Sequence, residues 1–183
     1  METERKGGMN ILGLDIGGTK CSVTACEADG ATVRVLEKQV FATDTTVSCE
    51  QMIGEYFPVT HRFMETYGYG CIGISCGGPL DSAAGMILSP PNLPNFIEFP
   101  ITKFLEKEFG VPVFLQNDAN ACALAEWLFG AGKGTENMVF LTFGTGLGAG
   151  LILAKRLRAR LSSMQKKTIP KQTMSRIETL LPV

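Results

Sequence analysis

Asp15 is the first residue of the sequence whose type and position suggest chemistry. It lies in an apolar run from Ile11 to Ile16, and Gly-Gly-Thr-Lys follows at positions 17–20. An acidic side chain near the end of a buried strand costs free energy unless it has a charged or hydrogen-bonded partner. Paired glycines allow a tight turn and a close approach to a ligand. The stretch therefore indicates a phosphate or metal–phosphate site, and an ordinary hairpin turn with Asp15 as a capping residue is the alternative.

Three further strand ends carry polar or glycine-rich turns. They are Cys-Gly-Gly-Pro at 76–79, Gly-Thr-Gly-Leu-Gly at 144–148 and the pair Asn117-Asp118. Loops at strand ends are where α/β sheets usually bind ligands. Asp118 in such a loop is a candidate general base that accepts a proton from a hydroxyl attacking phosphorus. The simpler interpretation of the pair is a helix N-cap, a role that Asp and Asn favour.

Two familiar nucleotide-binding motifs fit these turns by letter but not by context. Residues 13–20 read G-x-x-x-x-G-T-K, in which Thr and Lys stand in the wrong order for a P-loop, and the β-branched residues that follow predict a strand instead of a helix. Residues 144–149 fit G-x-G-x-x-A, but Leu-Ile-Leu at 151–153 continues as a strand, so a Rossmann turn is not supported. Hairpin turns with exposed N–H groups are the better interpretation, since such turns can hold phosphate oxygens.

The elements that would position these residues alternate between strands and helices. The expected strands cover residues 10–16, 21–28, 31–41, 69–75, 86–88, 111–115, 138–143 and 149–154. The expected helices cover residues 48–67, 102–109 and 117–129, and Pro58 should start, kink or divide the first of them. The first three strands form an antiparallel meander, and the later mixture of strands and helices predicts an α/β fold with a mixed sheet.

The composition excludes several classes of protein. The chain is 45% hydrophobic and 19% charged, which is ordinary for a globular protein. It has no apolar run long enough to cross a membrane, and its polar first residues do not form a signal peptide, so we expect a cytoplasmic protein without a membrane partner. Six cysteines without a C-x-x-C pair indicate neither a zinc site nor a disulfide framework. His61 is the single histidine, which excludes a multi-histidine metal site within this chain.

Charge divides the sequence near Ala154. Residues 1–154 carry 9 Lys and Arg against 17 Asp and Glu, a net charge of −8, whereas residues 155–183 carry 8 against 1, a net charge of +7. One interpretation is a basic arm that binds nucleic acid or an anionic surface. The arm has no aromatic residue to stack on bases, which counts against single-strand binding. The other interpretation is a non-native segment produced by a change of reading frame, which the abrupt reversal of charge favours.

Five ordered motifs resemble the ROK family of bacterial sugar kinases and sugar-linked repressors. They are LGLDIGGTK at 12–20, GISCGGPLD at 73–81, SPPNLPNF at 89–96, NDANACALAE at 117–126 and LTFGTGLGAGLIL at 141–153. The resemblance covers about residues 9–154 and implies an actin-like, ribonuclease-H-like ATPase fold. It implies a flexible N-terminus (1–8), an N-terminal ATPase lobe (9–133), the first hairpin of a truncated second lobe (134–154) and a basic tail unlike the family (155–183).

The resemblance also implies a role for each matching position, with ATP and Mg²⁺ as cofactors. Asp15 would hold the magnesium, and Asp118 would be the catalytic base. The first phosphate loop would comprise Gly17, Gly18, Thr19 and Lys20, and the second would comprise Gly144, Thr145, Gly146 and Gly148. The sugar would be bound by Asn117, Gly77, Gly78 and Asn92.

The expected function is ATP-dependent phosphorylation of a hydroxyl on a hexose or amino sugar. The family's glutamate–histidine sugar segment, zinc motif and adenosine pocket have no counterpart in this sequence, so we expect the chain to have little or no activity alone. Because the LDIGGT motif begins within fifteen residues of Met1, the repressor branch is disfavoured. The alternatives are a non-enzymatic sugar-sensing or partner-binding fragment that acts through the basic tail, and a homo-oligomer that buries the hairpin of residues 138–154.

Overall fold

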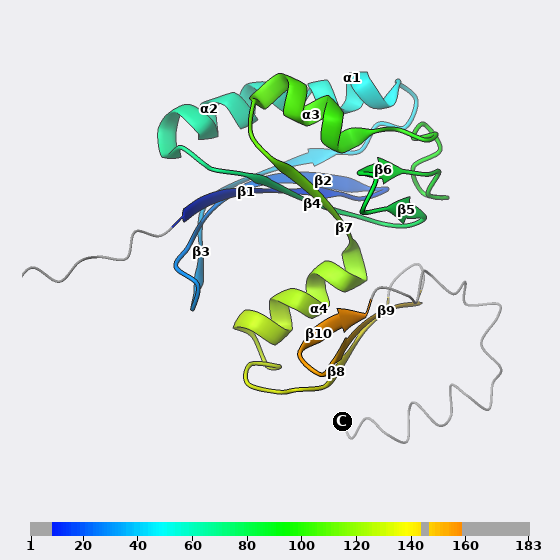
Figure 1. Ribbon diagram of the computed structural model, residues 1–183. Coiled ribbons are helices and arrows are strands. Elements are labelled where there is room, and N and C mark those ends of the chain that lie inside the picture. Colours follow the sequence, from blue (N-terminus) through cyan, green and yellow to red (C-terminus); the bar gives the residue numbers. More distant parts are fainter. Residues whose placement is uncertain (1–8, 144–146, 159–183) are drawn as a thin grey trace, which may run out of the picture.

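The computed structural model describes residues 9–143 and 147–158. Figure 1 shows three helices on one face of a twisted sheet, and a fourth helix, α4, which leads from the opposite side of that sheet to a smaller sheet. Among the described residues, no helix combines the length and apolar character needed to span a membrane.

The larger sheet has five strands in the order β3-β2-β1-β4-β7. Its strands are β1 (Met9–Ile16), β2 (Lys20–Ala28), β3 (Val33–Ala42), β4 (Ile72–Cys76) and β7 (Val113–Asn117). The first three pair antiparallel, whereas β4 pairs parallel with both β1 and β7. The expected meander and the mixed sheet are therefore confirmed.

The helices that cover this sheet are α1 (Cys49–Gly54), α2 (Phe57–Tyr67) and α3 (Ile101–Phe109). Ser48 begins α1 with a capping box, in which its side chain accepts a hydrogen bond from Gln51 N while the Gln51 side chain bonds back to Ser48 N. Pro58 lies in the first turn of α2, where proline is tolerated, so the helical stretch is divided in two and not kinked. Gly110 ends α3 in the left-handed conformation, as its position after Phe109 predicts.

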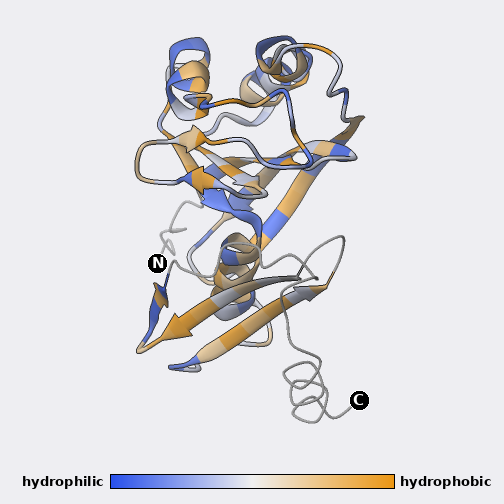
Figure 2. Cartoon of the chain, turned by 90° about the vertical axis from the view of Figure 1, so that its right-hand side faces the viewer, coloured by the Kyte–Doolittle hydropathy of each residue, from blue (hydrophilic) through white to orange (hydrophobic). Residues whose placement is uncertain are grey.

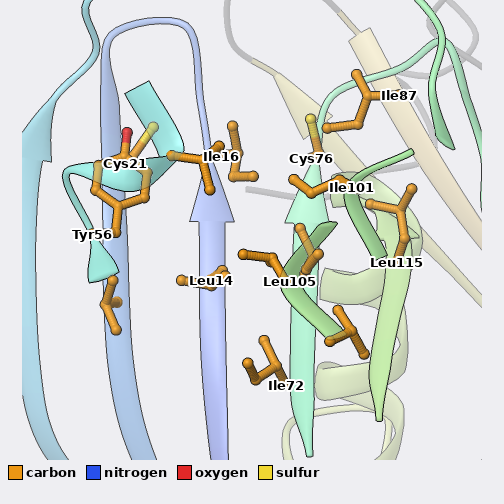
Figure 3. Packing of buried hydrophobic residues seen from close by; sticks show 14 of the residues in the cluster. Leu14, Ile16, Cys21, Tyr56, Ile72, Cys76, Ile87, Ile101, Leu105 and Leu115 are labelled. Carbon is orange, nitrogen blue, oxygen red and sulfur yellow. The ribbon is translucent and has the colours of Figure 1, made fainter. Parts of the chain in front are cut away.

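The core lies between the helices and one face of the larger sheet. In Figure 3, Leu14 and Ile16 lie on β1, Cys76 lies on β4 and Leu115 lies on β7, and Leu105 of α3 belongs to the same buried cluster. Alternate residues of a strand face opposite sides of the sheet. This alternation buries Leu12, Leu14 and Ile16 of β1 and leaves Asp15 exposed on the other face.

A small hairpin and a long loop connect β4 to α3. The hairpin consists of β5 (Leu80–Asp81) and β6 (Met86–Ile87), of which only the second strand was expected. The loop that follows is anchored by Leu93 and Phe96, both fully buried, and by two hydrogen bonds between Ile87 and Phe99. Its Pro- and Asn-rich sequence is therefore part of the packed structure.

Helix α4 (Asp118–Phe129) packs on the smaller sheet, whose order is β10-β9-β8. Its strands are β8 (Met138–Phe143), β9 (Leu147–Leu153) and β10 (Arg156–Arg158), and Figure 2 shows that β8 and β9 are largely apolar. Gly150 allows β9 to approach the helix, because a Cβ atom at this position would lie 2.4 Å from the Cβ of Ala123.

The change in charge at Ala154 is not a break in the smaller sheet. Ala154 and Lys155 have φ angles of 50° and 59° and form a tight turn into β10, which pairs antiparallel with β9. The third strand was not expected, because its sequence Arg-Leu-Arg has too few apolar residues to indicate one. Residues 1–8 and the rest of the basic tail, residues 159–183, lie outside the described part of the chain.

Candidate active site

The carboxyl ends of three parallel strands, β1, β4 and β7, lie next to one another at the same end of the larger sheet. Ile16 at the end of β1 is the register partner of Cys76 at the end of β4, and Cys76 is the partner of Asn117 at the end of β7. The turns that follow these strands therefore lie side by side. The Gly17–Lys20 turn, the Gly77–Gly78 turn and the start of α4 are far apart in the sequence. This end of the sheet brings them together.

The junction of β7 and α4 combines a helix cap with side-chain atoms that lie toward the Gly77–Gly78 turn. Asn117 is the N-cap, and its Oδ1 accepts a hydrogen bond from Asn120 N at 3.4 Å. Its other side-chain atom, Nδ2, lies toward Gly78, 3.6 Å from the position that a Cβ would take there. The cap interpretation is therefore correct for Asn117, yet the cap uses only one end of the amide.

Asp118 is exposed at the first position of α4. Its Oδ1 accepts a hydrogen bond from Ala119 N at 2.8 Å, while Oδ2 lies toward Gly77, 3.9 Å from the Cβ position of that glycine. The positive end of a helix dipole stabilises a carboxylate at this position. The side chain faces the Gly77–Gly78 turn, so a substrate hydroxyl bound at that turn would lie within reach of Oδ2.

The first turn is held by a residue that the sequence did not single out. Thr43, directly after β3, donates from Oγ1 to Gly17 O at 2.6 Å and from its backbone N to Thr19 O at 3.1 Å. Gly17 N donates to Lys20 O at 3.2 Å across the turn. These bonds fix the carbonyl groups of the turn, and the side chains of Thr19 and Lys20 are exposed.

Asn92 lies between the first turn and the Gly77 turn. A Cβ at Gly18 would lie 2.6 Å from the Cβ of Asn92, and a Cβ at Gly77 would lie 3.8 Å from both Oδ1 and Nδ2 of Asn92. The structure thus brings Asn92 into the same cluster as Gly18, Gly77, Asn117 and Asp118.

Cys76 at the end of β4 belongs to the buried core and is not reactive. It is fully buried, and burial followed by the negative charge of Asp118 raises its pKa to about 12, with a smaller contribution from Asp15. The thiol is therefore neutral at physiological pH, and only a thiolate is a good nucleophile. Both carboxylates also raise the pKa of Cys122 on α4, after burial as the main cause. The negative charges of Asp15 and Asp118 therefore both influence the region around Cys76 and Cys122.

The residues at the carboxyl end of the strands fit a magnesium ion that is bound together with phosphates. Magnesium commonly takes one or two protein carboxylates and completes its shell with water and substrate phosphates. Asp15 offers an exposed carboxylate two residues before Gly17, the first residue of the glycine turn. Within residues 9–143 and 147–158, no group of three His, Cys, Asp or Glu side chains gathers as a metal site.

The second glycine turn is only partly described. Gly144, Thr145 and Gly146 lie outside the described residues, so their expected phosphate contacts stay a prediction. Gly148 is in β9, where its Cβ position would lie 3.1 Å from the Cβ of Ala119, the residue after Asp118. The described end of this turn is therefore next to the start of α4.

His61 does not belong to the cluster. It lies on α2, and its Nε2 is 3.0 Å from Glu108 Oε1 of α3 on the helical side of the molecule. A histidine-dependent mechanism at the strand ends is therefore not supported by the described residues.

The sequence analysis did not identify Thr43 or Gln116 as residues of this site. The only available indication for Gln116 was its place directly before Asn117 at a strand end.

The mixed sheet, its strand-end turns and the helix that begins with Asn-Asp define one lobe of an actin-like ATPase. The chain belongs to the ROK family, whose family model matches residues 11–160. It is 35% identical over 144 residues to a glucokinase from Thermotoga maritima, an alignment that covers 79% of this chain and 44% of that protein.

Two solved structures have the same fold. A ROK family glucokinase from Streptomyces griseus, solved with glucose and AMPPNP, superposes with a TM-score of 0.73 at 31% identity, covering 86% of this chain and 49% of that one. A ROK hexokinase from Thermus thermophilus gives a TM-score of 0.70 at 39% identity, covering 84% and 50%. The chain spans about half the length of the curated relatives and structures that it matches.

Proposed function

We propose that the chain provides the phosphate- and sugar-binding lobe of a kinase that transfers the γ-phosphoryl group of ATP to a hydroxyl of a hexose or amino sugar. One observation carries this proposal. The register of β1, β4 and β7 brings Asp15, the Gly77–Gly78 turn and Asn117-Asp118 together at the carboxyl end of these strands. The similarity to a glucokinase solved with glucose and AMPPNP supports the same substrate class.

Asp118 is the proposed base. Its Oδ2 accepts the proton of the sugar hydroxyl while the hydroxyl oxygen forms a bond to the γ-phosphorus, and the bond from that phosphorus to the bridging oxygen of ADP breaks. The Nδ2 group of Asn117 donates a hydrogen bond to a second sugar hydroxyl and orients the ring. Because Gly77 and Gly78 have no side chains, the sugar can approach their backbone beside both groups.

The nucleotide phosphates lie on the turn that follows β1. Backbone N–H groups of this turn other than Gly17 N, which donates to Lys20 O, bind phosphate oxygens, and the glycines allow the close approach. The Lys20 side chain adds a positive charge near the phosphates. Magnesium held by Asp15 would neutralise the charge that develops on the transferred group. Gly144, Thr145, Gly146 and Gly148 contribute the opposing turn in this proposal.

We expect the 183-residue chain to turn over slowly without further protein. Phosphoryl transfer depends on two lobes that close over the substrates, which positions the reacting groups and excludes water. The second lobe of this chain consists of one three-stranded sheet in its described part, and the relatives are about twice as long. Binding of sugar and nucleotide is therefore a more direct test than the rate of turnover.

The test combines binding with catalysis on the purified chain. Titrations with glucose, fructose and N-acetylmannosamine, each with and without AMPPNP and Mg²⁺, should show saturable binding of at least one sugar. A coupled assay of ADP formation should then show a slow, sugar-dependent rate that Asp118→Asn abolishes. If none of these sugars binds and the Asp118→Asn protein matches the wild type, the proposal is wrong. Turnover at the rate of an ordinary kinase would contradict only the expectation of slow turnover.

A second candidate function rests on the charge of the tail. Eight basic residues and one acidic residue lie between Lys155 and Val183, which favours a sugar-sensing or partner-binding fragment that attaches to an anionic partner. Deletion of residues 159–183 tests this idea and keeps β10 in its sheet. A salt-dependent mobility shift of duplex DNA that disappears with the deletion would support it, and no shift at low salt would rule it out.

Self-association is proposed for the outward face of the smaller sheet. Val139, Phe143 and Leu153 are 60%, 56% and 40% exposed, and β8 is an edge strand. Exposed apolar surface beside an open strand edge favours pairing with another chain. Size-exclusion chromatography with light scattering tests this, and a monomer at all accessible concentrations would contradict it.

A further inference from the structure

We infer that Gln116 is a positioning residue that fixes Asn117 and Asp118 in their working orientation. A single atom, Gln116 Oε1, lies within hydrogen-bond distance of three donors, which belong to the end of β7, to α4 and to the β5–β6 hairpin. It accepts from Asn117 N at 2.9 Å, from Asn120 Nδ2 at 3.2 Å and from Ser82 Oγ at 3.4 Å. The inference concerns the sugar side of the site and rests on the proposed function.

The backbone explains why an acceptor is needed at this position. Strand β7 is the edge of the larger sheet, so alternate N–H groups point away from β4 and have no neighbouring strand to bond. Two of these outward groups are met by side-chain oxygens, Val113 N by Glu106 Oε1 at 3.3 Å and Asn117 N by Gln116 Oε1. Gln116 therefore closes the open edge where the strand passes into α4.

Asn120 extends this bond into a closed ring. Its Nδ2 donates to Gln116 Oε1, its backbone N donates to Asn117 Oδ1, and Asn117 N donates to Gln116 Oε1. Asn120 is 7% exposed, so its amide has little access to water, and a buried polar group without a partner is costly. The ring therefore ties the last residues of β7 to the first turn of α4.

Ser82 connects the same oxygen to a third segment. It follows β5 in the hairpin that begins just after the Gly77–Gly78 turn. Gln116 thus links the helix start, which bears Asn117 and Asp118, to the hairpin next to the glycine turn that these residues face. Both sides of the proposed sugar pocket are held by one side-chain carbonyl.

Loss of this acceptor should misplace the base without removing it. Catalytic geometry is sensitive, since a displacement of about 1 Å can reduce a rate by about 100-fold. Gln116→Met keeps the length of the side chain and removes the acceptor, whereas Gln116→Glu keeps an acceptor oxygen at the same place. Gln39→Met is the matched control, because Gln39 is exposed on β3 away from the strand ends.

The first measurement is amide hydrogen exchange of the full chain by NMR, which needs no ligand. In the Gln116→Met protein, the amides of Asn117 and Asn120 should exchange at least about tenfold faster than in the wild type. Gln116→Glu should restore slow exchange, and Gln39→Met should leave both amides unchanged. Unchanged exchange in Gln116→Met would overturn the inference.

The second measurement separates the sugar side from the nucleotide side. Glucose affinity and the sugar-dependent kcat/KM should fall at least fivefold in Gln116→Met and recover in Gln116→Glu, while AMPPNP–Mg²⁺ affinity stays within twofold. An equal loss of both affinities would indicate a general structural role and would overturn the inference. If the wild type binds none of the three sugars and Asp118→Asn matches it in the ADP assay, the proposed function fails, and the exchange data still decide whether Gln116 holds the junction.

A third variant guards against misfolding of Gln116→Met. Ser82→Ala removes only the longest of the three bonds and leaves the helix start intact. It should lower glucose affinity by about twofold to threefold and leave the exchange of Asn117 unchanged. Glucose affinity equal to that of the wild type would overturn the claim that Gln116 links the two sides of the pocket.

Discussion

Gly18 and Asn92 are packed so closely that no side chain fits at Gly18. A Cβ at this position would lie 2.6 Å from the Cβ of Asn92 and 2.7 Å from its backbone oxygen. The turn proposed for the nucleotide and the loop proposed for the sugar therefore share one contact. A side chain added at Gly18 would therefore push the two segments apart.

Gly18→Ala should disturb both segments at once. The added methyl group forces the Asn92 loop outward, and such overpacking costs about 1–3 kcal/mol. We expect a lower melting temperature together with weaker binding of both glucose and AMPPNP, measured by thermal unfolding and titration. Gly54→Ala is the control, because no atom lies within 4 Å of its Cβ position in α1, and it should be neutral or stabilising. A Gly18→Ala protein with wild-type stability would contradict the contact.

Asp118→Asn should separate folding from catalysis. Asparagine can still accept the hydrogen bond from Ala119 N that Asp118 Oδ1 accepts at 2.8 Å, so the start of α4 is retained. Without a base, the sugar-dependent rate should fall by about 10²–10⁴-fold. Steady-state ADP formation and circular dichroism test the two halves of this expectation. Asp44→Asn, an exposed carboxylate bonded to Thr46, is the matched control and should keep the wild-type rate.

Thr43→Val should weaken the nucleotide side selectively. It removes the Oγ1 bond to Gly17 O and keeps the backbone bond from residue 43 to Thr19 O. The loss of one such bond costs about 1 kcal/mol, which corresponds to roughly fivefold in AMPPNP affinity if the turn becomes disordered without ligand. Isothermal titration with AMPPNP–Mg²⁺ and with glucose measures the selectivity. Thr46→Val, an exposed threonine of the same loop, should leave both affinities unchanged. Equal losses for glucose and AMPPNP would contradict a local role.

The strand-end cluster illustrates what the sequence can and cannot predict. The apolar run of β1, the glycine turn after it and the cap at Asn117 are local features, so their existence followed from residue type and spacing. The register that sets Ile16 beside Cys76 and Cys76 beside Asn117 is a tertiary property, and no local pattern specifies it.

The sequence did not predict two kinds of feature. Some residues bond to partners that are far away in the sequence, and some strands are too short to show a pattern. Thr43 bonds to Gly17, 26 positions away, and the contact depends on the pairing of β2 with β3. Gln116 contacts Ser82 only because a hairpin folds back onto the edge of β7. Strands β5 and β10 have two and three residues, too few for an alternation to be recognised.

Cys76 should make the fold sensitive to alkali. Burial and then the charge of Asp118 raise its pKa from 9.0 to about 12, so the folded protein keeps the thiol proton while the unfolded chain releases it above pH 9. The stabilisation is complete below pH 9 and is lost between about pH 9 and 12, by up to about 1.4 kcal/mol per pH unit. Thermal unfolding from pH 8 to 10.5 should show a shallower decline for Cys76→Ala than for the wild type. Parallel curves would contradict the assignment.

Gly150→Ala should loosen the contact between β9 and α4. The new methyl group would lie 2.4 Å from the Cβ of Ala123 and 2.6 Å from the backbone oxygen of Ala119, so the strand must move away from the helix. Overpacking of this kind costs about 1–3 kcal/mol.

Gly73→Ala in β4 is the matched control for Gly150→Ala, since its Cβ position has no atom within 4 Å. Because alanine is preferred over glycine in a strand by roughly 0.5–1 kcal/mol, Gly73→Ala should be neutral or stabilising. Urea unfolding of both proteins measures the difference. Ala119 follows Asp118 directly, so Gly150→Ala should also broaden the amide signals of residues 118–120, whereas equal stability of the two variants and unchanged signals would show that β9 does not support the start of α4.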